Sequence, residues 1–256
     1  MRLGWEIAMW FALDLLGTFT RHDFALVLAG VRKTSSGREL DRLLDRWRQQ
    51  QIVTRIGRGR NVQFRITDKA LDRIHGTSPD AEWDRCWDGK WRVFSFDLPM
   101  HDRKERIRLW RHLRVARFGF LQRSVWVWPH DAEASLRHMV EAHGVPECFC
   151  GFEVDRLFLC DNRDVVTSAW EWEQIRTDHQ AYLNQAANWL RALSTTDRIH
   201  SLLRIARTEH GAYREAFMRD PLLPRTLWPD PYLGTAVQSR HTEIHAGLRD
   251  RIRQRH

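Results

Sequence analysis

The segment from Ser36 to Ile66 constrains the fold more than any other part of the chain, because it combines a helix start, a helical apolar stripe and a hairpin pattern. Ser36 and Glu39 fit a capping box, in which the serine hydroxyl bonds the Glu39 amide and the Glu39 carboxylate reaches back. Apolar residues then recur at helical spacing at Leu40, Leu43, Leu44 and Trp47. This pattern predicts an amphipathic helix beginning at Ser36.

Two alternating segments follow this helix, Ile52 to Ile56 and Val62 to Ile66. The residues between them, Gly57-Arg58-Gly59-Arg60-Asn61, predict a hairpin with a basic, glycine-rich tip. Upstream, residues 3–16 and 21–29 have the pattern of two buried helices, and residues 67–74 predict a short closing helix. Three helices followed by a hairpin is the order of a winged helix-turn-helix.

The positive charge of the chain is concentrated in the same region. Ten lysines and arginines and three acidic residues lie between Arg32 and Arg65, a net charge of +7. The whole chain carries +8, so the rest of the sequence contributes only +1 (8 minus 7). A charge excess confined to one helix-and-hairpin module indicates a local contact with a polyanion, and DNA is the first candidate.

The residues predicted to bind DNA fall into two groups. A recognition helix lies in the major groove with its N-terminal residues near the base edges. By that geometry the first group, in and just before the third helix, is Lys33, Thr34, Ser35, Ser36, Arg38, Arg42 and Arg46. The second group, on the hairpin tip, is Arg58, Arg60 and Asn61, whose contacts with phosphates or the minor groove would set affinity more than sequence preference.

Two carboxylates share the third helix with these arginines. Asp41 and Asp45 are expected either to hold Arg38 or Arg42 in one rotamer or to accept a hydrogen bond from cytosine. The simpler alternative for the whole region is a solvated basic face on an ordinary helix. Because a cap, an apolar stripe and a basic hairpin coincide here, the sequence favours DNA binding.

The middle of the chain alternates between strand and helix patterns. Strands are expected at residues 91–96, 124–128 and 147–159, the last as one or two strands, and helices at residues 102–116 and 131–143. Ile107, Trp110, Leu113 and Val115 are the expected core side of the first of these helices, and Phe118-Gly119-Phe120 is expected to form a turn. The order β-α-β-β-α-β, or one close to it, predicts a small ferredoxin-like domain.

No strand pattern appears after about residue 165. Residues 165–193, 197–219 and 235–254 predict helices, and the proline-rich stretch from Pro221 to Pro231 predicts a rigid bend. The chain is therefore predicted to be an α+β multidomain protein. The expected domains are a winged helix at residues 1–76, a ferredoxin-like domain at 84–162 and a helical domain for dimerisation or effector binding at 163–256.

Sequence motifs give little support for a bound metal or for catalysis. Cys148 and Cys150, with His138 and His143 upstream, are too closely spaced for a typical structural zinc site. No phosphate loop or dinucleotide fingerprint is present, and the other histidines are scattered. We therefore expect no catalytic residues, no metal ligands and no cofactor. Four cysteines without a disulfide spacing, and no targeting segment, make the cytoplasm the expected location.

Three landmarks carry a resemblance to a known family. Residues 87–99, residues 118–129 with their Phe-Gly-Phe-Leu and Val-Trp-Val-Trp-Pro segments, and Pro221-Leu222-Leu223-Pro224 with the following Leu227-Trp228-Pro229 resemble the phenylacetic acid degradation repressors, the PaaX-like transcriptional regulators. The landmarks occur in the family's order over nearly the whole chain. The resemblance implies a winged helix, a middle domain similar to the CRISPR-associated adaptation nuclease fold, and a helical C-terminal domain.

The same resemblance implies a function. Members are dimeric repressors, and the founding type releases DNA when it binds phenylacetyl-coenzyme A. We therefore expect a homodimer on a palindromic operator, with an acyl-coenzyme A thioester as effector. One alternative is a metal-dependent nuclease using Asp97, because an aspartate at the equivalent strand end is the proposed metal ligand of the nuclease fold. The other is a DNA-binding factor without a small-molecule effector.

Overall fold

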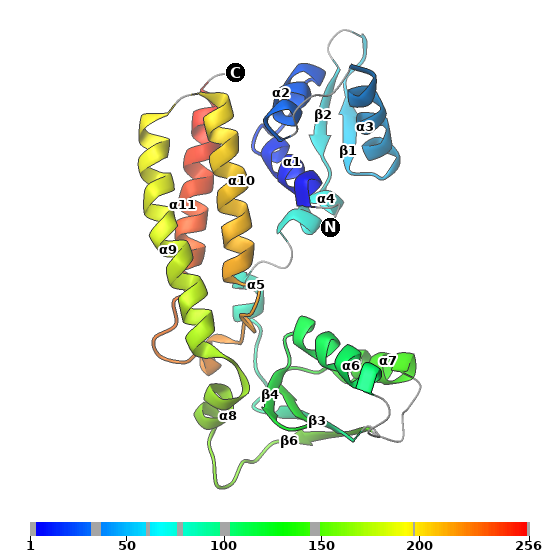
Figure 1. Ribbon diagram of the computed structural model, residues 1–256, viewed down its shortest axis with the longest axis vertical. Coiled ribbons are helices and arrows are strands. Elements are labelled where there is room, and N and C mark those ends of the chain that lie inside the picture. The colour runs from blue at the N-terminus through cyan, green and yellow to red at the C-terminus, as the bar shows by residue number, and fades with distance from the viewer. Residues whose placement is uncertain are drawn as a thin grey trace. The chain divides into compact units, whose positions relative to one another are not determined.

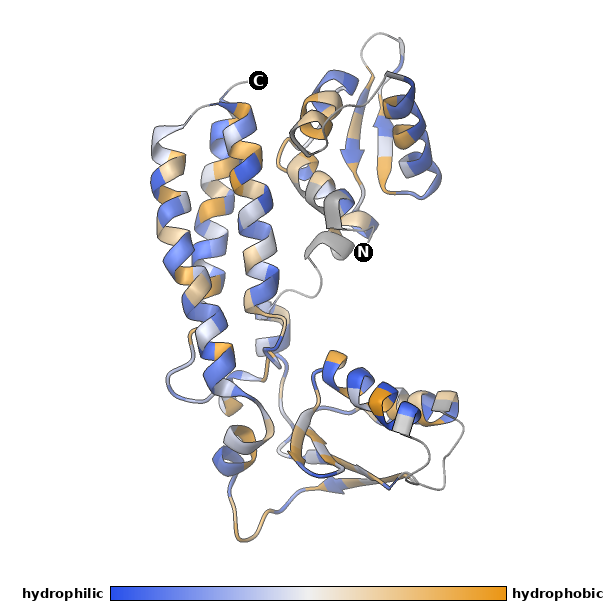
Figure 2. Cartoon of the chain, in the orientation of Figure 1, coloured by the Kyte–Doolittle hydropathy of each residue, from blue (hydrophilic) through white to orange (hydrophobic). Residues whose placement is uncertain are grey.

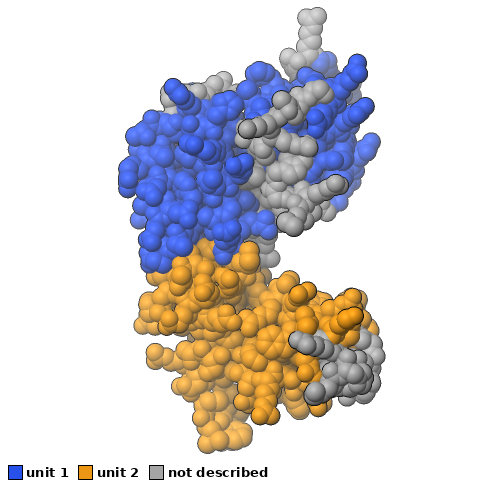
Figure 3. Space-filling view, viewed as in Figure 1, with its two compact units in different colours: residues 1–78, 180–215, 234–256 blue, residues 79–179, 216–233 orange. Residues whose placement is uncertain are grey.

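The chain is assembled from two compact units, and neither is a single continuous segment. The computed structural model describes residues 4–31, 37–59, 62–75, 79–97, 103–143, 149–196 and 198–254. One unit comprises residues 1–78, 180–215 and 234–256, and the other comprises residues 79–179 and 216–233 (Figure 3). The chain therefore crosses between the units within the long helix α9 (Trp172–Thr195).

The N-terminal module has the predicted element order. It consists of α1 (Gly4–Asp14), α2 (Arg21–Val31), α3 (Gly37–Gln49), β1 (Val53–Ile56), β2 (Gln63–Ile66) and α4 (Asp68–His75) (Figure 1). The strands β1 and β2 pair antiparallel, as the alternating pattern predicted. A further pairing was not predicted: Phe19, between α1 and α2, exchanges backbone hydrogen bonds of 2.9 and 2.8 Å with Phe64 of β2.

Aromatic side chains form the core of this module. The predicted apolar stripe of α3 is confirmed, because Leu40, Leu43, Leu44 and Trp47 are all buried. The Trp47 ring packs edge-on against Trp10 of α1, with centroids 5.8 Å apart, and against Phe24 of α2, at 5.2 Å. Phe19 stacks on Phe64 at 5.9 Å and joins the hairpin to the same core.

The second unit contains a four-stranded antiparallel sheet. Its elements follow as β3 (Trp91–Phe96), α6 (Arg103–Val115), β4 (Gly119–Gln122), β5 (Val125–Trp128), α7 (Glu133–His143) and β6 (Phe149–Val154). The strand order is β4-β5-β3-β6, and α6 and α7 cover one face of the sheet (Figure 1). The predicted order β-α-β-β-α-β is confirmed, with β6 as a single strand.

Two predictions about this part of the chain need correction, the second only in part. Gly119 begins the strand β4 instead of lying in a turn, and a Cβ atom added there would lie 2.7 Å from both Ala169 and the Trp170 ring, so the close approach of this segment requires glycine. In α6 the predicted core side was right for Leu113, which is fully buried, and for Trp110, which packs against the same core. It was wrong for Ile107 and Val115, which are 43% and 82% exposed, whereas Leu109 is fully buried.

The remaining elements are helical. They are α5 (Pro79–Trp83), α8 (Asn162–Ala169), α9, α10 (Ile199–Ala216), the 3₁₀ helix η4 (Arg225–Leu227) and α11 (Gly234–Arg253). The helix predicted at 165–193 is divided into α8 and α9, since Trp170 has extended backbone torsions that end α8. The short helix α5 lies between the first two predicted domains, which end at residue 76 and begin at residue 84. None of the described helices is both long and apolar enough to cross a membrane.

Candidate nucleic-acid interface

The outer surface of α3 presents two arginines one helical turn apart. Arg38 and Arg42 are both exposed, and their spacing of four residues places them on one face of the helix. Figure 2 shows that hydrophilic residues cover most of α3 outside its buried apolar stripe. The interior side of this helix therefore fixes its position, while the two guanidinium groups remain at the surface.

The acidic residues of α3 do not hold these arginines, contrary to one of the expectations above. Asp41 forms a bidentate pair with Arg21 of α2, with contacts of 2.7 and 3.0 Å, and Arg21 also donates to the Gly37 carbonyl at 3.2 Å. The hydrogen bonds from Arg21 lower the pKa of the Asp41 carboxyl group. Asp45 pairs with Arg48 at 3.2 Å along the helix.

Arg46 has a different environment from Arg38 and Arg42, although the three residues follow one another at a spacing of four on α3. Its guanidinium group forms an ion pair with Glu6 of α1. Neither Arg38 nor Arg42 forms an ion pair with another residue that the structure describes. These two arginines are consequently the α3 cations best able to meet an external anion.

The hairpin tip places a third arginine at the surface. Arg58 is exposed and lies between Gly57 and Gly59, whose φ angles of 80° and 65° belong to the left-handed region that glycine adopts without strain. The predicted contacts Lys33, Thr34, Ser35, Ser36, Arg60 and Asn61 lie outside the described residues. The capping box at Ser36 is outside them for the same reason.

These arginines have the chemistry that a nucleic-acid ligand requires. A guanidinium group is charged at all physiological pH values and presents a planar fork of donors that fits phosphate oxygens or the O6 and N7 atoms of guanine. On α3, Arg38 and Arg42 are positioned like base-reading side chains near a helix N-terminus. On the hairpin, an exposed arginine at the tip such as Arg58 is suited to phosphate contacts.

Among the residues that the structure describes, Asp97 has no partners for a metal site. This residue is exposed directly after β3. Within the described part of the chain, the side chains close enough to share a metal ion are Glu209, His241 and His245, and Asp97 does not belong to that group. Sequence analysis missed these three residues, although His241 and His245 stand four apart in a predicted helix, a spacing that could have identified them.

Two family models match the chain, and together they span most of it. The model described as "PaaX protein central Cas2-like domain" matches residues 84–166, and the model described as "PaaX-like protein C-terminal domain" matches residues 170–255. Both matches begin after the N-terminal module.

One similar solved structure supports the fold alone. It is the uncharacterized protein Rv0674 from Mycobacterium tuberculosis, which is 18% identical, with a TM-score of 0.55 over 92% of this chain and 91% of that chain. No curated protein matches the sequence.

Proposed function

Because the chain belongs to the PaaX-like family of regulators, we propose that it binds duplex DNA through the N-terminal module and controls transcription, most simply as a repressor. The observation that carries this proposal is the set of exposed arginines, with Arg38 and Arg42 on α3 and Arg58 on the hairpin. The three helices, the strand contact at Phe19 and the hairpin support a winged helix-turn-helix. In this arrangement α3 enters the major groove while the hairpin lies along the adjacent backbone.

The proposed regulator acts as a homodimer. Two winged helices related by a two-fold axis bind half-sites about one helical turn, or a multiple of it, apart. An acyl-coenzyme A thioester is the proposed effector, and it releases DNA by favouring the dimer shape whose spacing does not fit the operator. A thermal shift on adding such thioesters to the purified chain, with and without operator DNA, tests this part of the proposal.

The proposal as a whole is tested by binding-site selection. Purified full-length protein is incubated with genomic fragments and excess random duplex at moderate salt, and the bound sequences are identified. We expect a small set of palindromic sites to be enriched. Equal recovery of all duplexes would remove the basis for a sequence-specific regulator, and hydrolysis of labelled DNA with Mg²⁺ or Mn²⁺ that disappears in Asp97→Asn would favour the nuclease alternative.

The double substitution Arg58→Ala with Arg60→Ala is expected to weaken binding to all DNA sequences by similar factors. The reason is that phosphate contacts release counterions without reading bases, so each lost contact reduces the slope of log K against log salt by about 0.9. Fluorescence anisotropy with operator and with random duplex at several salt concentrations measures both quantities. If the slope and the affinity both stay at wild-type values, the hairpin does not contact phosphates.

Arg38→Ala provides the matched contrast, because it removes the same side chain from α3 instead of the hairpin. We expect it to relax the base preference at one position in each half-site, with a loss of roughly 1–3 kcal/mol of discrimination for a bidentate arginine–guanine contact. Binding-site selection with the variant measures this change. Recovery of the unchanged wild-type motif would show that Arg38 does not read a base.

A further inference from the structure

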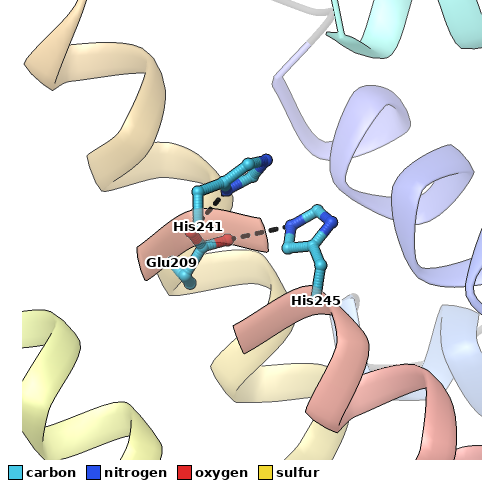
Figure 4. A group of neighbouring side chains, drawn as sticks. All are labelled: Glu209, His241 and His245. Atoms are coloured by element: carbon cyan, nitrogen blue, oxygen red, sulfur yellow. Dashed lines mark hydrogen bonds and ion pairs between the residues drawn. The ribbon is translucent and has the colours of Figure 1, made fainter. Parts of the chain in front are cut away.

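A buried carboxylate lies between two imidazole rings in the helical part of the first unit. Glu209 comes from α10, and His241 and His245 come from adjacent turns of α11 (Figure 4). The Nδ1 atom of His241 is 2.7 Å from Glu209 Oε1, and the Nε2 atom of His245 is 3.2 Å from Glu209 Oε2. Glu209 is fully buried, and the two histidines are 8% and 9% exposed.

These residues occupy positions where the helices otherwise bury apolar side chains. On α11, Val237, Ile244 and Leu248 are fully buried on the same side as the two histidines. On α10, Leu202 is fully buried two turns before Glu209, and Ala206 is fully buried one turn before it. Removing a carboxylate from water is unfavourable unless it gains a compensating partner. At these positions Glu209, His241 and His245 therefore stand in place of apolar core side chains. The buried carboxylate needs either a proton shared with a histidine or a cation to compensate its charge.

We propose that Glu209, His241 and His245 bind a divalent transition-metal ion, with Zn²⁺ as the reference ion. Two histidines four residues apart on one helix and a carboxylate from a second helix form a His₂Glu ligand set of the kind that zinc uses. The candidate ligand atoms all lie within 4.8 Å of one another. Tetrahedral zinc with bonds of about 2.1 Å requires ligand atoms roughly 3.4 Å apart. The N···O contacts of 2.7 Å and 3.2 Å would therefore have to open by about 0.7 Å and about 0.2 Å.

Neighbouring side chains hold the ligands in the way that outer-shell residues of metal sites do. The Tyr182 hydroxyl of α9 donates a hydrogen bond of 2.6 Å to Glu209 Oε1. The Tyr213 ring stacks on His241 with centroids 3.6 Å apart and an interplanar angle of 13°. Such partners fix the orientation of the ligating groups and typically affect metal affinity about 10–100-fold.

The ligand set also leaves a free position for the ion. Both histidines are buried but retain a small exposed fraction, so the cluster lies close to the surface of the helices. Three protein ligands leave the fourth position of a zinc ion to water or to another small ligand. This inference replaces the expectation of no metal site and does not depend on the DNA-binding proposal.

In the first test, a chelator removes bound metal ions from the full-length protein, and the protein is then titrated with Zn²⁺ in the absence of DNA. We expect the unfolding midpoint to rise, because an ion that binds only the folded state stabilises it. Co²⁺ then serves as a spectroscopic probe. The exposed thiols of Cys86, Cys150 and Cys160 could bind the ion instead. Co²⁺ bound to thiolates has an intense charge-transfer band, which Co²⁺ bound only to nitrogen and oxygen ligands lacks.

Variants assign the site. His245→Ala is expected to lower Zn²⁺ affinity more than about 100-fold, a larger loss than outer-shell changes produce, while Tyr182→Phe, which keeps all three ligands, is expected to lower it about 10–100-fold. His200→Ala is the matched control, since His200 is an exposed histidine on α10, and it should bind like the wild type.

Each outcome decides the proposal. A wild-type midpoint unmoved by Zn²⁺, or a Co²⁺ spectrum of thiolate type that is unchanged in His245→Ala, would overturn it and leave a buried carboxylate–imidazole ion pair. If His245→Ala does not fold, the wild-type titration and the folded Tyr182→Phe variant decide the question. Equal Zn²⁺ affinities of Tyr182→Phe and the wild type would then count against the site.

Discussion

Trp47→Ala is expected to unfold the N-terminal module and to abolish DNA binding while the other helices remain folded. Trp47 is fully buried and packs edge-on against Trp10 and Phe24, so it joins α3 to α1 and α2. Its carbonyl also accepts the Ile52 amide at 2.8 Å, where the chain leaves α3 for the hairpin. Truncating a buried tryptophan to alanine typically destabilises by about 3–5 kcal/mol, which is a large fraction of the stability of a small domain.

Chemical denaturation followed by circular dichroism, together with DNA-binding anisotropy, measures this effect. Hydrogen exchange of the α1 to β2 amides locates it within the chain. Arg48→Ala on the same helix is the control, since Arg48 is exposed and has only a surface ion pair with Asp45, so its loss should change stability by less than about 1 kcal/mol. Wild-type protection of these amides in Trp47→Ala would contradict the description of the core.

Asp220→Ala is expected to have a comparably large effect in the second unit. The fully buried Asp220 carboxylate accepts hydrogen bonds from the Tyr232 hydroxyl at 2.8 Å and from the Leu222 amide at 2.7 Å, and it lies 3.1 Å from His179 Nε2. Burial, followed by the charge of Asp220, raises the pKa of Tyr232 above its usual range, so this hydroxyl keeps its proton and must donate. Each buried donor left without an acceptor costs about 1–3 kcal/mol.

The Asp220 prediction has two comparison variants. Asp220→Asn keeps an oxygen acceptor and should recover part of the loss, whereas Asp155→Ala removes an exposed carboxylate and should leave the unfolding midpoint nearly unchanged. Thermal and urea unfolding of the three variants, each compared with the wild type, measure how much stability each substitution removes. Equal midpoints for Asp220→Ala and Asp155→Ala would show that the buried hydrogen bonds of Asp220 contribute nothing to stability.

The order of elements in the N-terminal module and in the central sheet could be predicted because both depend on local periodicity. The stripe from Leu40 to Trp47 follows a period that only a helix buries on one side, and the alternation from Ile52 to Ile56 suits only a strand. In contrast, the apolar side of α6 was predicted only in part: Leu113 is buried as expected, but Ile107 is exposed and Leu109 is buried. Ile107 and Leu109 are equally apolar, and only the packing against the sheet distinguishes them.

The candidate DNA contacts were predicted as a group, but their individual environments were not. Arg38, Arg42 and Arg46 are indistinguishable by spacing, and the position of Glu6 on α1 decides that Arg46 is the one with an intramolecular partner. The pairing of Asp41 with Arg21 depends in the same way on how α2 lies against α3. Contacts between residues far apart in sequence require the tertiary arrangement of the helices.

The amino-acid sequence alone therefore determined the helices, the hairpin, the local concentration of positive charge and the resemblance to a family of regulators. Each of these depends only on the types and spacing of residues that are close together in the sequence. Only the tertiary structure decided which charges are neutralised and that Glu209 meets His241 and His245 across 32 and 36 positions of chain. The physical reason is that ion pairs and ligand sets depend on distances of a few ångströms between side chains, and those distances are set by how separate helices pack.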